Sequence, residues 1–113
     1  MIVEPDFRLE LLPEITRRIL SISQPEKIIL FGSFARGDYN PDSDLDLLVV
    51  MDNIKSTRYE SNRLRQVLRG LLTPVDILVV TPQQVERHRN DIGLIYHSAL
   101  NEGKIIYERP TAV

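Results

Sequence analysis

The chain contains no cysteine and only two histidines among its 113 residues. Without cysteine there is no disulfide framework, no thiolate metal site and no cysteine nucleophile. Two histidines are also too few to build a histidine-rich metal cage. These absences exclude sulfur-based reaction centres and histidine-rich metal sites before any motif is considered.

Long apolar runs are equally absent. Residues 47–51 and 77–80 are among the longest runs, whereas about 20 consecutive apolar residues are needed to cross a bilayer. The N-terminus reads Met-Ile-Val-Glu-Pro-Asp, with acidic residues where a signal peptide has basic ones followed by a long apolar stretch. We therefore expect a cytoplasmic protein that makes no contact with a membrane.

A strong excess of positive charge is missing as well. The formal net charge is −2 at pH 7 and the isoelectric point is about 5.6, which disfavours a general nucleic-acid binder. We expect no direct nucleic-acid partner. Arginine outnumbers lysine by eleven to three, and arginine suits bidentate contacts with phosphates and carboxylates, but this skew alone identifies no partner.

The chain has enough residues for one folded domain. A globular chain of this size buries roughly two-thirds of its unfolded surface, so a core forms without disulfides or metals. Hydrophobic residues make up 42% of the sequence and charged residues 27%, which is typical of a folded protein. We expect a single domain over residues 1–113, with a core from about residue 10 to residue 107 and flexible ends.

Hydrophobic periodicity and turn residues define the expected elements. They predict helices at 11–22, 54–72, 82–89 and 92–101, a helical turn at 33–36, and strands at 27–31, 44–51, 75–80 and 104–107. The second helix has Leu64, Leu68 and Leu72 on its apolar face. The order predicts an α/β or α+β fold, in which a small mixed sheet packs with helices. Residues 108–113 are expected to fray.

Three aspartates stand at or near the starts of predicted strands: Asp44, Asp46 and Asp76. Side chains two residues apart in a strand point the same way, about 7 Å apart, so Asp44 and Asp46 share a face. Two carboxylates this close raise each other's pKa unless a cation lies between them, and oxygen ligands of this kind favour Mg²⁺. Asp76 interrupts an otherwise apolar strand. If that strand lies beside the first, the three acids form a two-metal site.

Gly32 and Ser33 directly follow a predicted strand and open the helical turn. Backbone N–H groups and a hydroxyl at such a place bind phosphate oxygens, and glycine lets the backbone approach closely. Arg36, one turn further on, either reaches the same anion or pairs with Asp38 or Asp42, and the sequence leaves both roles open. Phosphoryl or nucleotidyl transfer needs a phosphate-binding turn close to a pair of metal ions, and here one loop separates the two predicted sites.

With these residues in place, the sequence resembles the polymerase-β-like nucleotidyltransferases. Their signature is a Gly-Ser pair, ten intervening residues and an Asp-x-Asp triplet, which this chain has at Gly32-Ser33 and Asp44-Leu45-Asp46, followed by a third acid at Asp76. The fuller stretches at 31–38 (Phe-Gly-Ser-Phe-Ala-Arg-Gly-Asp) and 43–49 (Ser-Asp-Leu-Asp-Leu-Leu-Val) resemble the minimal nucleotidyltransferase (MNT) subgroup. Members of this subgroup are short stand-alone domains encoded beside a HEPN-domain partner.

This resemblance, which extends over residues 10–107, implies both a fold and a reaction. The fold would be a small mixed sheet backed by helices, with the acids at one open edge. Asp44 and Asp46 would bind two Mg²⁺ ions, and Asp76 would bind the ion beside the acceptor and help to deprotonate the acceptor. Gly32 and Ser33 would hold the β- and γ-phosphates of ATP. Similar proteins are antitoxins that transfer AMP from ATP to a tyrosine hydroxyl of a HEPN ribonuclease toxin.

One residue departs from the family pattern, and two other functions stay open. Phe34 follows Ser33 where relatives often carry a polar or basic side chain, which leaves one fewer phosphate ligand. A non-catalytic antitoxin of the same fold would neutralise its partner by binding alone, although three intact carboxylates favour catalysis. A nucleotidyltransferase acting on a small hydroxyl compound is the other alternative. Because the chain has no second domain to form a pocket, we expect the acceptor to arrive on another protein.

Overall fold

The computed structural model describes residues 6–89, 91 and 95–111. The elements follow in the order α1 (Phe7–Glu10), α2 (Leu12–Ile22), β1 (Lys27–Phe31), α3 (Ser33–Arg36), β2 (Leu45–Val50), α4 (Thr57–Val67), β3 (Val75–Val80), α5 (Pro82–His88), α6 (Ile95–Glu102) and β4 (Lys104–Glu108). Of the helix predicted at 92–101, residues 92–94 lie outside the described part. In the part that is described, no helix is long and apolar enough to cross a membrane.

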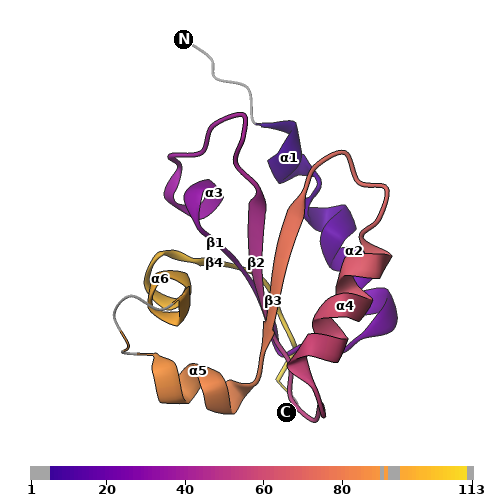
Figure 1. The fold of residues 1–113 in the computed structure, drawn as a ribbon, viewed down its shortest axis with the longest axis vertical. Helices are drawn as coiled ribbons and strands as arrows, with labels where there is room; N and C mark the ends of the chain where they lie inside the picture. Colours follow the sequence, from indigo (N-terminus) through magenta and orange to yellow (C-terminus); the bar gives the residue numbers. More distant parts are fainter. Residues whose placement is uncertain (1–5, 90, 92–94, 112–113) are drawn as a thin grey trace.

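Within these described residues, four strands form one sheet in the order β3-β2-β1-β4 (Figure 1). β1 runs antiparallel to both β2 and β4, whereas β2 and β3 are parallel. The sheet is therefore mixed. With helices packed against it, the α/β fold predicted from the sequence is confirmed.

The parallel pair depends on α4, which connects β2 to β3. Parallel strands need such a crossover, because the chain must return to the end of the sheet from which it started. α4 also covers the outer edge of β3: the Ser61 hydroxyl accepts a hydrogen bond from the Val79 N–H (3.3 Å), and Arg65 donates to the Ile77 carbonyl (3.1 Å). As a result, the starts of β2 and β3 and the end of β1 lie at the same end of the sheet.

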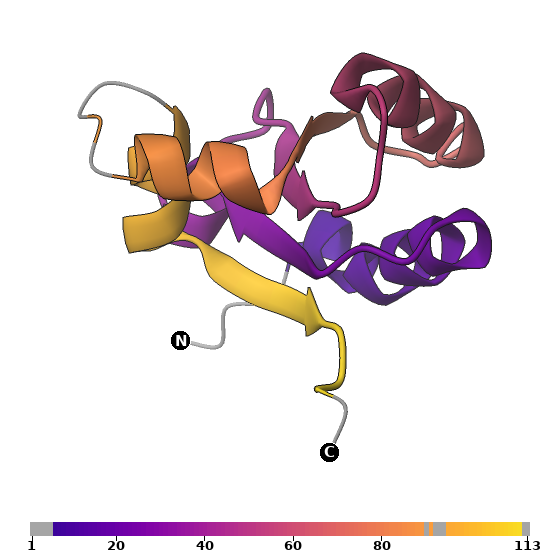
Figure 2. The same cartoon turned by 90° about the horizontal axis from the view of Figure 1, so that it is seen from below.

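The two faces of the sheet are covered differently. α2 and α4 pack on one face, and α5 and α6 lie on the other (Figure 2). The first face carries the larger core, in which Leu47 and Val49 of β2 pack with Ile15, Ile19 and Leu64. The second face carries a smaller cluster: Ile29, Phe31, Leu48, Val50, Val80 and Ala99. Because side chains alternate along a strand, successive residues of β2 belong to different cores.

The helix predicted at 54–72 is shorter at both ends. α4 begins at Thr57, because the Ser56 side chain accepts a hydrogen bond from a backbone N–H of the first turn (3.1 Å) and caps the helix. The helix ends before Gly70, which has φ +88° and lets the chain turn away. The prediction that Leu72 lies on the apolar helical face is therefore wrong: its side chain is 85% exposed, in the loop before β3.

Regular structure extends further towards both ends of the chain than the sequence predicted. α1 precedes the first predicted helix, and its residue Arg8 is buried. At the other end, β4 extends to Glu108, and Arg109 forms an ion pair with Asp52 (2.9 Å). Contacts thus reach past residue 108, where fraying was expected.

Candidate active site

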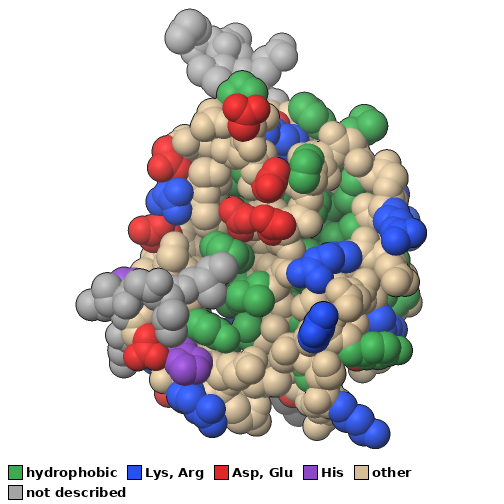
Figure 3. All heavy atoms as spheres, viewed as in Figure 1, with side chains coloured by type: hydrophobic (Ala, Val, Ile, Leu, Met, Phe, Trp, Pro, Cys, Tyr) green, Lys and Arg blue, Asp and Glu red, His purple; other side chains and the backbone are tan. Residues whose placement is uncertain are grey.

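Three residues form a row across one end of the sheet. Phe31 of β1 is the register partner of Asp46 of β2, and Asp46 is the register partner of Asp76 of β3. Asp44 lies directly before β2, two residues from Asp46, and its negative charge acts on the Asp46 carboxylate. The predicted carboxylates thus come together at one end of the sheet, which we call the acidic end (Asp44, Asp46 and Asp76). Figure 3 shows acidic side chains gathered over this end of β2 and β3.

The charges at the acidic end affect one another. The Asp46 carboxylate is half-buried, and its pKa lies above the ordinary aspartate value. Burial is the largest cause, because it disfavours the charged form. The negative charges of Asp76 and Asp44 raise the pKa of Asp46 further, whereas Arg36 lowers it. Asp44 and Asp76 are therefore close enough to Asp46 to repel its charge, and a cation bound between these carboxylates would relieve the repulsion.

Gly32 packs directly against Asp46. Its backbone angles, φ +73° and ψ −155°, lie in a region that is essentially restricted to glycine. A Cβ atom added to Gly32 would overlap the Asp46 carboxylate and would lie 3.2 Å from its Cγ atom. Glycine is required here both for the turn and for the close approach. The predicted phosphate-binding turn therefore touches the predicted metal-binding acids.

Ser33 begins α3, a helix of four residues that starts where β1 ends. The Gly32 carbonyl accepts hydrogen bonds from two N–H groups of this helix (3.1 and 3.0 Å), which hold the turn closed. The Arg36 guanidinium forms ion pairs with Asp38 (3.3 Å) and with Glu102 of α6 (3.5 Å). Of the roles that the sequence left open for Arg36, the structure thus contains the pairing with Asp38, and the Arg36 charge still acts on Asp46 at a distance.

Arg8 holds the loop before Asp44, and sequence reasoning missed it. The buried guanidinium donates hydrogen bonds to the carbonyls of Ser43 (2.8 Å) and Asn40 (3.2 Å) and to both carboxylate oxygens of Asp6 (2.9 and 2.8 Å). Through its side-chain hydrogen bonds, which are the largest cause, Arg8 lowers the pKa of Asp6 to about 2. The sequence signal was slight: an acid two residues before an arginine, in a stretch outside the predicted core.

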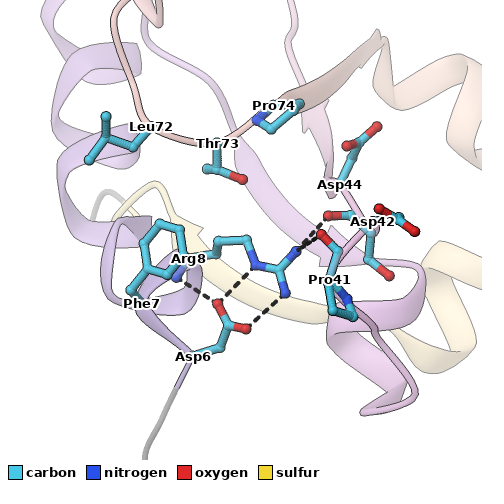
Figure 4. Close-up of a pocket in the computed structure, with 10 residues that line it drawn as sticks. Asp6, Phe7, Arg8, Pro41, Asp42, Asp44, Leu72, Thr73 and Pro74 are labelled. Atoms are coloured by element: carbon cyan, nitrogen blue, oxygen red, sulfur yellow. Dashed lines mark hydrogen bonds and ion pairs between the residues drawn. The ribbon is translucent and has the colours of Figure 1, made fainter.

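A cavity of about 540 Å³ opens beside Asp44 (Figure 4). It is lined by α1, by the loop that leads into β2 and by the loop that leads into β3. Two apolar side chains line it while staying largely exposed: Phe7 at 53% and Leu72 at 85%. Volumes of this order accommodate a small ligand or part of a larger one. The cavity reaches Asp44 between α1 and the loop that leads into β3.

The donors at the acidic end suit a hard divalent cation that arrives with a nucleotide. In the ranges that the structure describes, no three histidine, aspartate or glutamate side chains form a closed metal site. Mg²⁺ rarely uses such a cage, because it keeps several waters and is bound through one or two carboxylates together with substrate phosphates. Open carboxylates beside a glycine turn therefore fit Mg²⁺ bound to a nucleoside triphosphate.

Comparison of the whole sequence with known proteins finds a matching family and several relatives. Residues 12–92 match the nucleotidyltransferase domain family. The chain is similar to the protein adenylyltransferase MntA of Aphanizomenon flos-aquae, with 31% identity over 102 residues, which are 88% of this chain and 68% of the relative. It is also similar to MJ0604 of Methanocaldococcus jannaschii, a protein assigned as a protein adenylyltransferase, with 32% identity over 84 residues, which are 73% of this chain and 78% of the relative.

Solved structures share the fold. A crystal structure of a protein from Sulfolobus solfataricus, assigned as a nucleotidyltransferase, superposes with a TM-score of 0.62 at 22% identity and covers 96% of this chain and 94% of that chain. A chain of a toxin–antitoxin crystal structure with AMP-PNP superposes with a TM-score of 0.53 at 19% identity and covers 84% of this chain and 72% of that chain. The arrangement of sheet and helices seen here is thus found in both crystal structures.

Proposed function

The chain belongs to the nucleotidyltransferase domain family, and from this premise we propose that it is a Mg²⁺-dependent protein adenylyltransferase. It transfers AMP from ATP to a tyrosine hydroxyl of a HEPN ribonuclease toxin and so acts as the antitoxin of that protein. The main support is the pairing of Asp46 with Asp76 across two parallel strands, with Gly32 packed against Asp46. Nucleotidyl transfer needs this contact, because a metal-bound triphosphate has to touch the acids and the turn together.

Each residue of the acidic end has a role in this proposal. Asp44 and Asp46 bind the two Mg²⁺ ions, and Gly32 and Ser33 contact the β- and γ-phosphates of ATP. Asp76, on the neighbouring strand, lies on the acceptor side, where it would bind the ion beside the acceptor and help to take up the acceptor's proton. When bound, Mg²⁺ neutralises phosphate charge and makes the acceptor hydroxyl easier to deprotonate. A tyrosine hydroxyl has a pKa of about 10, so it needs such help to react at neutral pH.

The direction from which the acceptor enters follows from the sheet order. The acceptor oxygen forms a bond to the α-phosphorus of ATP, the bond from that phosphorus to the bridging oxygen breaks, and pyrophosphate leaves. In-line displacement puts the acceptor opposite the leaving group. Gly32 follows β1 on one side of β2, and Asp76 lies on β3 on the other side. The acceptor therefore enters from the β3 side, past Asp76.

The relatives support a protein partner. MntA of Aphanizomenon flos-aquae is named a protein adenylyltransferase, and a chain of similar fold occurs in a toxin–antitoxin structure with AMP-PNP. By extension, the partners of this chain are a toxin protein and ATP, without direct binding to nucleic acid or membrane. We expect the reaction to take place in the cytoplasm.

The test mixes the protein with ATP, Mg²⁺ and the product of the neighbouring gene, and measures the masses of both proteins by mass spectrometry. We expect AMP on a tyrosine of the partner. Asp44→Asn should lower the rate by about a hundredfold or more, because several kcal/mol of metal-dependent stabilisation is lost. The variant should fold normally, since it removes a repulsion. Asp52→Asn is the matched control: Asp52 follows the other end of β2 and pairs with Arg109, so transfer should be unchanged.

Two outcomes would replace the proposal. If neither protein gains mass and Asp44→Asn still neutralises the partner, the chain is an antitoxin that acts by binding alone. If AMP appears on a small hydroxyl compound and not on a protein, the cavity of about 540 Å³ beside Asp44 holds that acceptor. The cavity is the observation in favour of this second alternative, because a protein acceptor was expected on the ground that so short a chain would form no pocket.

A further inference from the structure

Arg8 of α1 uses its whole guanidinium in hydrogen bonds. Nε and Nη2 donate to the two Asp6 oxygens (2.9 and 2.8 Å), and Nη2 also donates to the Asn40 carbonyl (3.2 Å). Nη1 donates to the carbonyls of Ser43 (2.8 Å) and Pro41 (3.4 Å). The Arg8 side chain is only 9% exposed. A buried guanidinium bonded on all sides is strongly orienting, because its donors form a rigid planar fork.

One set of these contacts reaches the turn that leads into Asp44. The Ser43 carbonyl belongs to the peptide group that ends at the Asp44 nitrogen, and a peptide group is planar and rigid. The turn is also closed by its own hydrogen bonds, from the Ser43 N–H to the Asn40 carbonyl (3.0 Å) and from the Asn40 N–H to the Ser43 hydroxyl (2.9 Å). Holding this turn therefore fixes the direction in which the Asp44 side chain leaves the backbone.

The flat face of the Arg8 guanidinium contacts the other half of the site. Its central carbon lies 4.5 Å from the centroid of the Phe34 ring, and Phe34 stacks on Tyr39 with 4.3 Å between the ring centroids. Phe34 is 3% exposed and directly follows Ser33 in α3. The residue that departs from the family pattern thus points into the protein and supports the phosphate-binding turn through a cation–π contact.

We propose that Arg8 is a positioning residue that holds Asp44 in place relative to the Gly32–Ser33 turn, and so sets the affinity of the site for Mg²⁺ and a triphosphate together. It acts through Ser43 and Phe34 and touches neither ligand. The inference rests on the proposed function, since it needs a nucleotide site at the acidic end. An arginine that merely stabilised α1 would affect unfolding and leave the Mg²⁺ dependence unchanged.

The test measures the binding of a non-hydrolysable ATP analogue by calorimetry at increasing Mg²⁺ concentration. Arg8→Met should raise the Mg²⁺ concentration at half-saturation by about tenfold or more, as expected when a group that orients a metal ligand is removed. Arg8→Lys keeps the charge and loses the planar fork, so it should give a smaller increase. Arg18→Met is the matched control, because Arg18 also donates to two backbone carbonyls, of Val67 and Arg69 (3.3 and 2.9 Å), at the end of α4.

Thermal unfolding of each variant identifies a temperature at which all of them are folded. Arg18→Met should lower the melting temperature without changing the Mg²⁺ half-saturation. If Arg8→Met does not fold, Arg8→Lys decides the question. An unchanged half-saturation in a folded Arg8 variant would overturn the inference and leave the proposed function intact. Failure of the wild-type protein to bind the analogue with Mg²⁺ would instead contradict the proposed function itself.

Discussion

The two faces of β2 differ in how far their apolar rows extend. On the face covered by α2 and α4, Leu45, Leu47 and Val49 are all fully buried. On the opposite face Leu48 is equally buried, but the residue two positions earlier is Asp46, in close contact with Gly32. The first core therefore runs the whole length of the strand, whereas the second stops at the acidic end.

The difference separates the part of the domain that stabilises it from the part that carries the groups proposed for catalysis. The row of Ile29, Leu48 and Leu78 packs in the smaller core, whereas in the next row only Phe31 belongs to that core and Asp46 and Asp76 stand beside it. Partial burial of the Asp46 carboxylate, beside acids that repel its charge, opposes folding. Proteins break local rules in this way mainly at functional sites and compensate elsewhere. Here the compensation comes from the complete core on the other face of the same strands.

Neighbouring leucines on β2 allow a direct test of this comparison and give its largest expected effect. Leu47→Ala should lower the free energy of unfolding by about 2–5 kcal/mol, towards the upper end, because the packed face cannot collapse into the cavity. For Leu48→Ala the loss in free energy of unfolding should be near the lower end of that range, because α5 and α6 cover a smaller core and can move closer. Urea unfolding measures both. An equal or larger loss for Leu48→Ala would break the comparison.

Two glycines with positive φ, Gly32 and Gly70, allow the effect of backbone strain to be distinguished from the effect of contact with Asp46. Gly32→Ala should cost about 1–3 kcal/mol of stability, because the backbone region excludes a side chain. It should also weaken nucleotide binding, since the new Cβ displaces the Asp46 carboxylate.

Gly70→Ala is the control, because Gly70 has φ +88° and no described atom lies within 4 Å of an added Cβ. It should cost about 1–2 kcal/mol and leave binding unchanged. Thermal unfolding and binding of an ATP analogue distinguish the two variants. Equal affinities would mean that the turn at Gly32 does not contribute to the nucleotide site.

The smallest expected effect is a pH dependence that arises at Asp46. The pKa of Asp46 is raised by burial and by Asp76 and Asp44, so between the ordinary aspartate value and the raised one the folded protein holds a proton that the unfolded chain has lost. The wild-type protein therefore loses stability as pH rises through this window, and the loss is complete above the raised pKa. Asp46→Asn lacks this titration and should become the more stable protein as pH rises.

Melting temperatures of both proteins across a pH series, in the presence of EDTA, test whether the wild-type protein loses stability relative to Asp46→Asn as pH rises. The difference between Asp46→Asn and the wild-type protein should grow through the window and then stay constant. Mg²⁺ with an ATP analogue should reverse the order, because the wild-type protein alone gains the bound ligands. A difference that does not vary with pH would show that the folded environment does not perturb Asp46.

Most of the fold was predictable because its signals are local. The strands at 27–31 and 75–80 are apolar runs bounded by turn residues, and the structure has them at the same bounds. The turn at Gly32 and the acids of the Asp-x-Asp triplet were recognised from their residue types, from their places beside predicted strands and from the resemblance to a family signature. α5 begins at Pro82, as the sequence predicted, and the Thr81 side chain caps it by accepting a hydrogen bond from the Gln84 N–H.

The remaining features depend on contacts between distant residues. Arg8 bonds carbonyls that lie 32 to 35 positions further along the chain, and no periodicity within α1 indicates them. The register that pairs Asp46 with Asp76 is set by how α4 returns the chain to the sheet. The error at Leu72 has the opposite origin: the helical spacing of leucines continues past the glycine that ends the helix, so a local pattern suggested burial that the folded chain does not provide.

The backbone ladder between β2 and β3 has a consequence for how this domain can diverge. Adjacent strands are about 4.8 Å apart in any sheet, so once α4 has set the register, the backbone spacing of Asp46 and Asp76 comes from main-chain geometry. The solvent-facing residues of α4 can therefore change while this spacing stays constant. The outer surface of the connecting helix and the spacing of the two acids can in this way vary independently within one small chain.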